Sequence, residues 1–155
     1  MMTRLLLSLA VCALTVSVSE ATAQEQATAT SDYRLTMPLL RKALPALYAA
    51  GKERCTERQR SPQEIAAMTV AQMQSELEGC TPVQRAAAAH GVTTRELALV
   101  SRALLQAGHR MAEEESAKAT GGTAALLPPG ALRDNVALVR QNEAELGRLI
   151  KDQQP

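Results

Sequence analysis

The stretch from Thr93 to Lys118, TTRELALVSRALLQAGHRMAEEESAK, decides the fold class of this chain. Apolar residues recur in it at spacings of three and four, which is the period of one helix face. These residues are Leu97, Val100, Leu104 and Met111. Thr93 stands three residues before Glu96, the spacing of a capping box that satisfies N–H groups at a helix start. The sequence therefore predicts a long central helix over residues 94–118.

Two other segments carry the same signal of a helix start. Residues 61–64 (SPQE) and 81–84 (TPVQ) each place a hydroxyl three residues before an acid or an amide. In both segments proline takes the first helical position, where its missing N–H is harmless. Gly79 and Gly91 stand where these helices should end, which predicts C-terminal caps in the left-handed conformation.

The apolar pattern extends this division into an all-α fold, a compact bundle of about five helices. Pro38 fits the opening turn of the first helix, whereas Pro45 should kink that helix or move its start later. The predicted helices run over residues 37–57, 62–78, 82–90, 94–118 and, from 132 or 135, to 151.

Composition supports the same fold class. Of 155 residues, 28 are alanine and 21 are leucine, the best helix formers, while only 1% are aromatic. Residues that fill β-sheets are scarce, which argues against a sandwich, a barrel or an α/β enzyme domain. With two tyrosines and no phenylalanine or tryptophan, the chain also lacks the platforms on which nucleic-acid bases stack.

The first 23 residues have the three parts of an export signal. Arg4 gives a positive start, residues 5–18 are mainly apolar, and residues 21–23 (ATA) form a cleavage pattern before Gln24. A membrane anchor is the alternative, but the apolar run is shorter than the ~20 residues that a spanning helix needs. We therefore expect a cleaved signal peptide over 1–23, no stable membrane span after cleavage, and a periplasmic or secreted protein.

The rest of the chain divides into a leader and one domain. Residues 24–32 (QEQATATSD) are polar without periodicity, which predicts a disordered leader. Residues 33–155 are expected to form a single helical domain. Cleavage removes one basic and one acidic residue and leaves the net charge at +1, so nothing indicates nucleic acid as a partner.

Two cysteines, Cys55 and Cys80, remain after cleavage. An even number in an oxidising compartment predicts one disulfide. This bond would join the ends of the first two helices and staple a helical hairpin, with a stabilisation of about 3–4 kcal/mol on the chain-entropy model. Two free thiols, or a metal site made from them, are the alternative, although a lone pair without histidine partners makes a poor zinc site.

His109 and Glu113 stand four residues apart on one face of the predicted central helix. An imidazole and a carboxylate placed in this way can share one metal ion, provided that another helix supplies a third ligand. The alternative is an exposed histidine–carboxylate pair. Glu113 also begins an acidic run over residues 113–115, for which a solvated face and a docking patch are the two interpretations.

Charge is distributed unevenly along the chain. Residues 33–60 carry seven Lys or Arg against two Glu, whereas residues 61–155 carry nine against eleven acids. The resulting charges of +5 and −2 favour intramolecular complementarity, with head-to-tail association between copies as the alternative.

Several segments resemble a family of small exported bacterial helical proteins. They are residues 33–37 (YRLTM), 91–97 (GVTTREL), 103–108 (ALLQAG) and 135–146 (NVALVRQNEAEL). The resemblance spans most of the chain after the signal and implies an all-helical single domain outside the cytoplasm. It implies no activity and assigns no role to any residue.

Common enzyme signatures do not occur in the sequence. It contains no GxGxxG, phosphate-binding loop, GxSxG, HExxH or CxxC pattern. The sequence therefore favours a non-enzymatic protein that binds a protein or peptide and needs no cofactor. A periplasmic protein that binds a small ligand or a metal is the alternative.

Overall fold

The computed structural model describes residues 32–52 and 61–152, and these residues form helices and loops without a strand. The all-α prediction is confirmed for them. The helices are α2 (Met37–Lys52), α3 (Pro62–Ala67), α4 (Val70–Glu78), α5 (Thr81–His90), α6 (Thr94–Ala119), α7 (Ala131–Gln141) and α8 (Glu143–Lys151).

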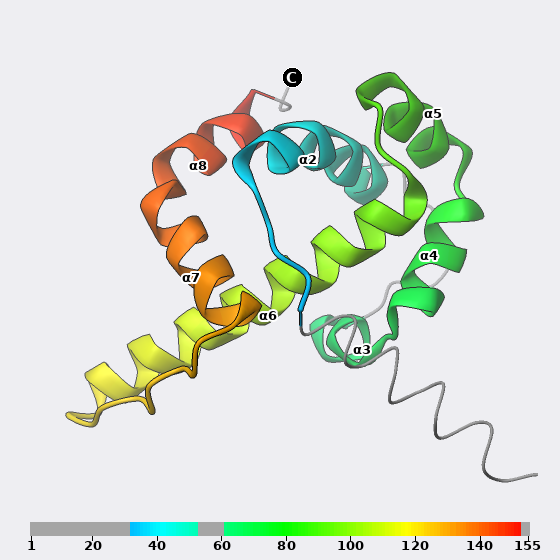
Figure 1. The fold of residues 1–155 in the computed structure, drawn as a ribbon. Coiled ribbons are helices and arrows are strands. Elements are labelled where there is room, and N and C mark those ends of the chain that lie inside the picture. Colours follow the sequence, from blue (N-terminus) through cyan, green and yellow to red (C-terminus); the bar gives the residue numbers. More distant parts are fainter. Residues whose placement is uncertain (1–31, 53–60, 153–155) are drawn as a thin grey trace, which may run out of the picture.

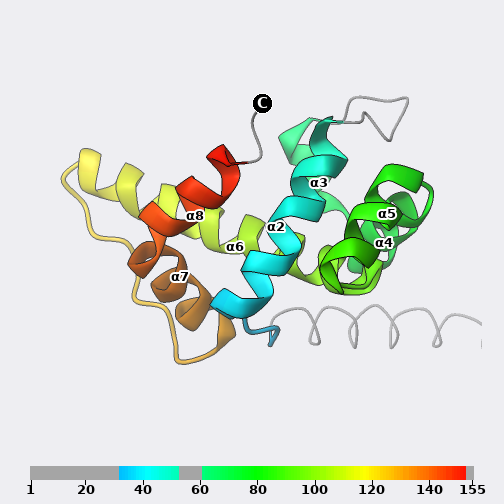
Figure 2. The ribbon, with the colours of Figure 1, turned by 90° about the horizontal axis from the view of Figure 1, so that it is seen from above.

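Helix α6 is the central element, as predicted, and is 26 residues long. It contacts α2, α4, α5 and α7. In Figures 1 and 2, α4 and α5 lie at its N-terminal end, α7 and α8 lie toward its C-terminal end, and α2 crosses between these pairs. The predicted capping box is present, since Thr93 Oγ1 accepts from the Glu96 N–H at 3.1 Å and Glu96 Oε2 accepts from the Thr93 N–H at 2.8 Å.

A core of leucine, valine and alanine holds α2, α5 and the first half of α6 together. The largest fully buried side chains are Leu40, Val83, Leu97 and Val100. Alanines at the contacts, among them Ala43, Ala46, Ala87 and Ala103, are also buried. Such small side chains let the helices approach closely, and the few large ones supply most of the buried apolar area.

The helix predicted over 62–78 is wrong in one respect, because the chain breaks it into α3 and α4 at Met68. Met68 is extended, with φ −66° and ψ 141°, and its side chain is buried. Thr69 then starts α4 with a capping box of its own, in which its hydroxyl accepts from the Gln72 N–H at 3.2 Å. The Thr-x-x-Gln signal of this second start is present in the sequence but lies inside a continuous helical pattern.

The last predicted helix is also divided, into α7 and α8 at Asn142. The Asn142 backbone leaves helical geometry, with φ −118° and ψ 16°. Its side-chain Nδ2 donates to the Leu138 carbonyl at 2.8 Å, and its backbone N–H donates to the same carbonyl at 3.2 Å, so both groups close the end of α7. The predicted bundle of about five helices therefore has two of its members split.

Two of the predicted caps are wrong. The N-cap of α5 is Cys80 rather than Thr81, and the Gln84 amide donates to the Glu78 carbonyl instead of completing a capping box. Gly79 keeps right-handed geometry at φ −71°, so it does not need the freedom of glycine. The other predicted C-cap is confirmed, since Gly91 is left-handed at φ 63°.

Basic residues at the start of the domain pair with acids near its end. Arg34 lies 2.7 Å from Asp134, and Arg41 contacts Glu145 through Nε at 2.8 Å and through a terminal nitrogen at 2.7 Å. These pairs join the segment before α2 to α7, and α2 to α8. The expectation of intramolecular charge complementarity is confirmed at these positions.

Several predictions fall on residues that the structure does not describe. They include the signal peptide over 1–23, the leader as far as residue 31, Cys55, and the end of the first helix at residue 57. Pro45 lies inside α2, which nevertheless begins at Met37, so the helix start is not moved. Within the described ranges, no helix is long and apolar enough to cross a membrane.

Candidate functional site

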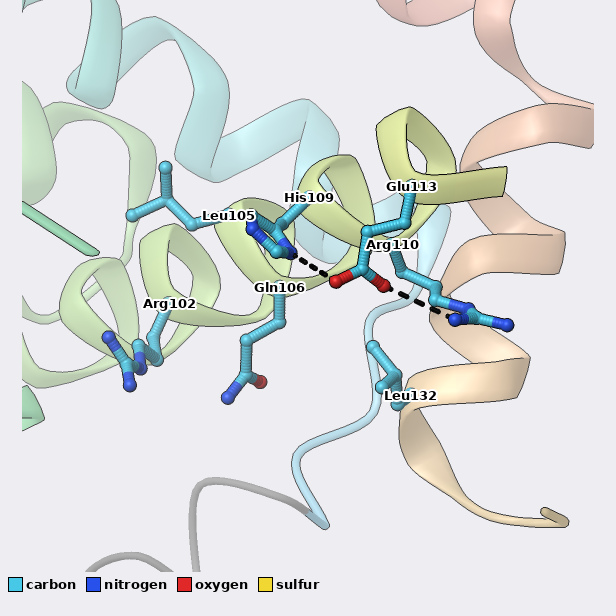
Figure 3. Close-up of a pocket in the computed structure, with 7 residues that line it drawn as sticks. All are labelled: Arg102, Leu105, Gln106, His109, Arg110, Glu113 and Leu132. Carbon is cyan, nitrogen blue, oxygen red and sulfur yellow. Dashed lines mark hydrogen bonds and ion pairs between the residues drawn. The ribbon is translucent and has the colours of Figure 1, made fainter. Parts of the chain in front are cut away.

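A pocket of about 320 Å³ lies along one side of α6 (Figure 3). Six of its lining residues come from the middle of α6 and one from the first turn of α7. They are Arg102, Leu105, Gln106, His109, Arg110, Glu113 and Leu132. The α6 residues recur at spacings of three and four, so the helix period itself places them on one face.

The pocket combines an apolar surface with polar groups around it. Leu105 is 38% exposed although most leucines of α6 are covered, and Leu132 faces the pocket from α7. Gln106 points into the same space in Figure 3, and its carboxamide has no hydrogen bond to another described residue. A carboxamide offers both a donor and an acceptor, so this group is available for a ligand with the same pair.

Arg102 joins the pocket to the break between α3 and α4. One of its terminal nitrogens donates to the Met68 carbonyl at 3.2 Å. The extended backbone of Met68 ends α3, so the Met68 carbonyl does not take part in the hydrogen bonds of that helix. The arginine thus fixes this neighbouring segment beside α6.

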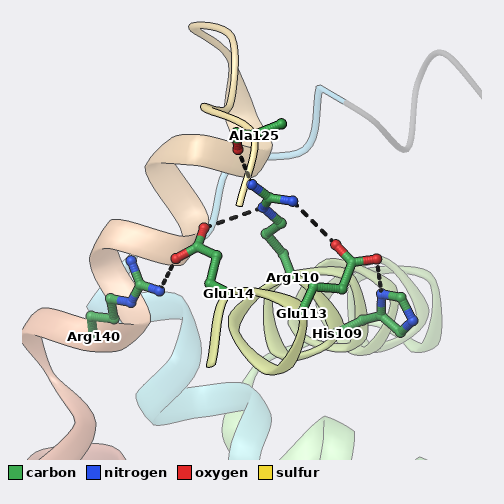
Figure 4. A network of polar contacts seen from close by, with 6 residues as sticks. All are labelled: His109, Arg110, Glu113, Glu114, Ala125 and Arg140. Atoms are coloured by element: carbon green, nitrogen blue, oxygen red, sulfur yellow. Dashed lines mark hydrogen bonds and ion pairs between the residues drawn. The ribbon is translucent and has the colours of Figure 1, made fainter. Parts of the chain in front are cut away.

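Arg110 is the centre of a polar network at the other end of the pocket (Figure 4). Its side chain is only 14% exposed. Its Nε donates to Glu114 at 3.2 Å, one terminal nitrogen donates to Glu113 at 3.2 Å, and the other donates to the Ala125 carbonyl. Glu114 also accepts from Arg140 of α7. The network therefore ties α6 to both α7 and the loop over residues 120–130.

Glu114 is held ionised by this arrangement. The hydrogen bond from Arg140, the charge of Arg140 and the charge of Arg110 lower the pKa of the Glu114 carboxyl, while partial desolvation opposes them. Of the predicted acidic run, Glu114 is therefore a half-buried ion-pair residue that Arg110 and Arg140 engage, so it is not free for docking. Glu115 is exposed, as the solvated-face interpretation expects.

The structure brings the two predicted metal ligands together but adds no third. His109 Nδ1 lies 3.3 Å from Glu113 Oε1, with the side chains 75% and 50% exposed. The other Glu113 oxygen is bonded to the Arg110 guanidinium. No cluster of three or more His, Cys, Asp or Glu suited to a metal occurs in the described part of the chain. The metal site stays a prediction.

The predicted disulfide is likewise untested. Cys80 is buried, with 3% of its surface exposed, at the N-cap of α5. Its predicted partner, Cys55, lies outside the described residues. The pairing of these two cysteines stays a prediction.

Sequence reasoning missed Asn135, the one buried polar residue of the described core, at 3% exposed. Its Oδ1 accepts from the Leu35 N–H at 2.8 Å, and its Nδ2 donates to the Tyr33 carbonyl at 2.9 Å. Burial, and secondarily the charge of Glu96, raise the pKa of Tyr33 in this region. An asparagine next to the apolar stripe of α7 was the available signal, but its partners are 100 and 102 residues away in the sequence.

No protein-family model, curated protein or solved structure matches this chain. The resemblance to small exported bacterial helical proteins therefore stays a prediction, and the function has to be argued from the pocket and its surroundings.

Proposed function

We propose that this chain is an exported, non-enzymatic binding protein whose α6 pocket holds a peptide segment of a partner protein. The observation that carries the proposal is the pairing of an apolar surface, the exposed Leu105 and the half-buried Leu132, with the Gln106 carboxamide, which has no hydrogen bond to another described residue. An apolar side chain of the peptide would lie on the two leucines. One peptide amide would bond to Gln106.

The size of the pocket favours a peptide over a cofactor. A volume of about 320 Å³ is at the lower end of the roughly 300–1,000 Å³ typical of sites for drug-sized ligands. It holds one or two side chains but not a dinucleotide or a haem. A shallow site of this kind gains its affinity from a segment that extends past it along the helix.

The polar groups around the pocket suit a main-chain ligand. The Gln106 carboxamide has N–H donors and an oxygen acceptor, which complement the C=O and N–H of a peptide group. Arg110 is already bonded to three acceptors and so contributes shape rather than a free charge. This network fixes one wall of the pocket before a ligand arrives, which lowers the ordering cost of binding.

Export and the disulfide belong to the same proposal. Residues 1–23 would be removed, and a Cys55–Cys80 bond would join the chain after α2 to the start of α5. Intact-mass measurement of the protein from cell fractions without reductant tests both points. The expected product begins at Gln24 and lacks two hydrogens, whereas an uncleaved chain or two free thiols would contradict the respective part.

Selection from a random peptide library tests the binding site. Peptides enriched on the native chain should share one branched apolar residue and should bind about tenfold more weakly to the Leu105→Glu and Gln106→Ala variants. Ala89→Glu, on the exposed side of α5, is the matched control and should leave the affinity unchanged. Equal affinity for all three variants would overturn the proposal.

A further inference from the structure

Residues 33–36, here called the strap, approach α2 in an extended conformation rather than as helix. Figure 1 shows this segment running from the start of α2 past α6. Asn135 of α7 bonds to the strap on both sides of Arg34, at the Tyr33 carbonyl and the Leu35 N–H. The asparagine therefore contacts only main-chain atoms of the strap.

This contact has the form of strand pairing. In a parallel sheet, one residue donates to the carbonyl of residue i and accepts from the N–H of residue i + 2 of its neighbour. The Asn135 carboxamide, with Nδ2 at 2.9 Å and Oδ1 at 2.8 Å, does the same for residues 33 and 35. Main-chain pairing supplies affinity for any extended peptide and leaves side-chain selection to the surrounding groups.

Two side chains of the strap are selected by their surroundings. Leu35 is 6% exposed and belongs to the core cluster. Arg34, on the opposite side of an extended chain, reaches the solvent-exposed rim and lies 2.7 Å from Asp134. Asp134 and Asn135 are adjacent in α7. Asn135 binds the main chain of the strap, and Asp134 binds its basic side chain.

We propose that this place on α7, here called the strap site, is a second peptide-binding site, which takes an extended segment with a basic residue followed by leucine. The chain's own strap occupies it as an internal competitor. Leu40, Ala43 and Ala46 of α2 are fully buried in the same core cluster as Leu35, so an incoming segment has to replace the Leu35 side chain there. None of the strap-site residues lines the α6 pocket, so this proposal and the proposed function fail independently.

Fluorescence anisotropy with a labelled synthetic DYRLT peptide, residues 32–36, tests the proposal on the chain after signal cleavage. The native chain should bind it weakly, because its own strap competes. Arg34→Glu turns the strap's ion pair into a repulsion while leaving the core intact, and should tighten peptide binding about tenfold. Leu35→Ala removes the buried anchor of the strap and should tighten binding about 30-fold or more.

Two controls separate the strap site from unspecific binding. A DYELT peptide should not bind the Arg34→Glu chain, because its glutamate would face Asp134. The double variant Arg34→Glu/Asp134→Lys reverses both charges and restores an internal ion pair, so it should bind DYELT as weakly as the native chain binds DYRLT. Circular dichroism of every variant reports whether the helices persist.

The proposal is overturned if both single variants keep their helices and bind DYRLT no more tightly than the native chain. It is also overturned if DYRLT and DYELT bind equally well. Loss of helix in both single variants would contradict it too, because the strap would then be a required part of the core rather than an exchangeable occupant.

Discussion

The two halves of α6 are held in place by different forces. Between Thr94 and Ala107 the helix buries Leu97, Ala98, Val100, Ala103 and Ala107. Beyond Ala107 no residue of α6 is buried, and this half projects past the other helices in Figures 1 and 2, with the loop over 120–130 returning along it. Here Arg110 and Glu114 supply the contacts to α7 and to the loop.

This difference separates apolar burial from polar contacts, while the candidate site spans both halves. The first half carries the apolar burial that dominates folding free energy, and on its outer side Leu105 and Gln106 line the pocket. The second half carries the pocket wall at His109, Arg110 and Glu113, where charged contacts tolerate exposure. The first half of α6 is thus anchored in the core, and its second half lies outside the core.

Leu97→Ala should give the largest effect and would show how far the first half determines stability. The side chain is fully buried, so its truncation should lower the free energy of unfolding by about 2–5 kcal/mol in urea denaturation. Leu105→Ala is the matched control, because Leu105 lies on the same helix and is 38% exposed. It should lower the free energy of unfolding clearly less. Equal losses would mean that the two positions are not buried differently.

Arg110→Met should give the next largest effect, this time from the second half. The variant keeps the aliphatic stem but removes the donors to two carboxylates and to the Ala125 carbonyl, at a cost of about 1–2 kcal/mol. Urea denaturation in low and high salt should show a smaller loss in high salt, because ions screen the exposed part of the network. A salt-independent loss would indicate that packing of the stem, not charge, holds this half.

Acid should weaken both halves of α6, through Glu114 in the second and Glu96 in the first. Both carboxyls have lowered pKa values, Glu114 mainly through the Arg140 hydrogen bond and Glu96 mainly through the capping bonds of Thr93. A lowered folded-state pKa gives stability that is full above the unfolded value of about 4.3 and is lost as the pH falls through the folded value.

The variants Glu114→Gln and Glu96→Gln distinguish these contributions. Each should lose less stability than the native chain between about pH 6 and about pH 3 in urea denaturation. At neutral pH Glu96→Gln should remain close to native, because glutamine also completes a capping box, whereas Glu114→Gln should be weaker. Acid profiles identical to the native one would contradict the ion-pair assignment.

His109→Ala should give the smallest effect, within about 0.5 kcal/mol of the native free energy of unfolding. The imidazole is 75% exposed, and its contact with Glu113 is at the surface. Thermal unfolding of native and variant chains checks this, with and without added zinc. A zinc-dependent rise in the native melting temperature that the variant lacks would revive the metal hypothesis.

The central helix, its capping box and most helix positions were predictable because their signals are local. Thr93 with Glu96, and Gly91 after His90, act within one turn of the chain. The breaks at Met68 and Asn142 were not predictable from periodicity, since each interrupts a pattern that continues in sequence. Each break depends on how the residues after it pack against other helices, and the local sequence pattern does not contain that information.

The site shows the same division. The spacing of His109 and Glu113 predicted their contact correctly, because four residues on a helix fix it. Arg110 stands three and four residues before Glu113 and Glu114, so the same helix period carried an unused signal for these contacts. It could not reveal that Arg140 approaches from α7, because that depends on how two helices pack. The role of Asn135 was not predictable either, because it depends on contacts between α7 and residues 33–35 at the start of the domain.

Residue-resolved hydrogen exchange along α6 tests the contrast between its halves most directly. We predict slow exchange for the amides from about Leu97 to Ala107 at low and high salt alike, and faster exchange, further accelerated by salt, for those beyond His109. Uniform protection along the helix that does not change with salt would contradict the account.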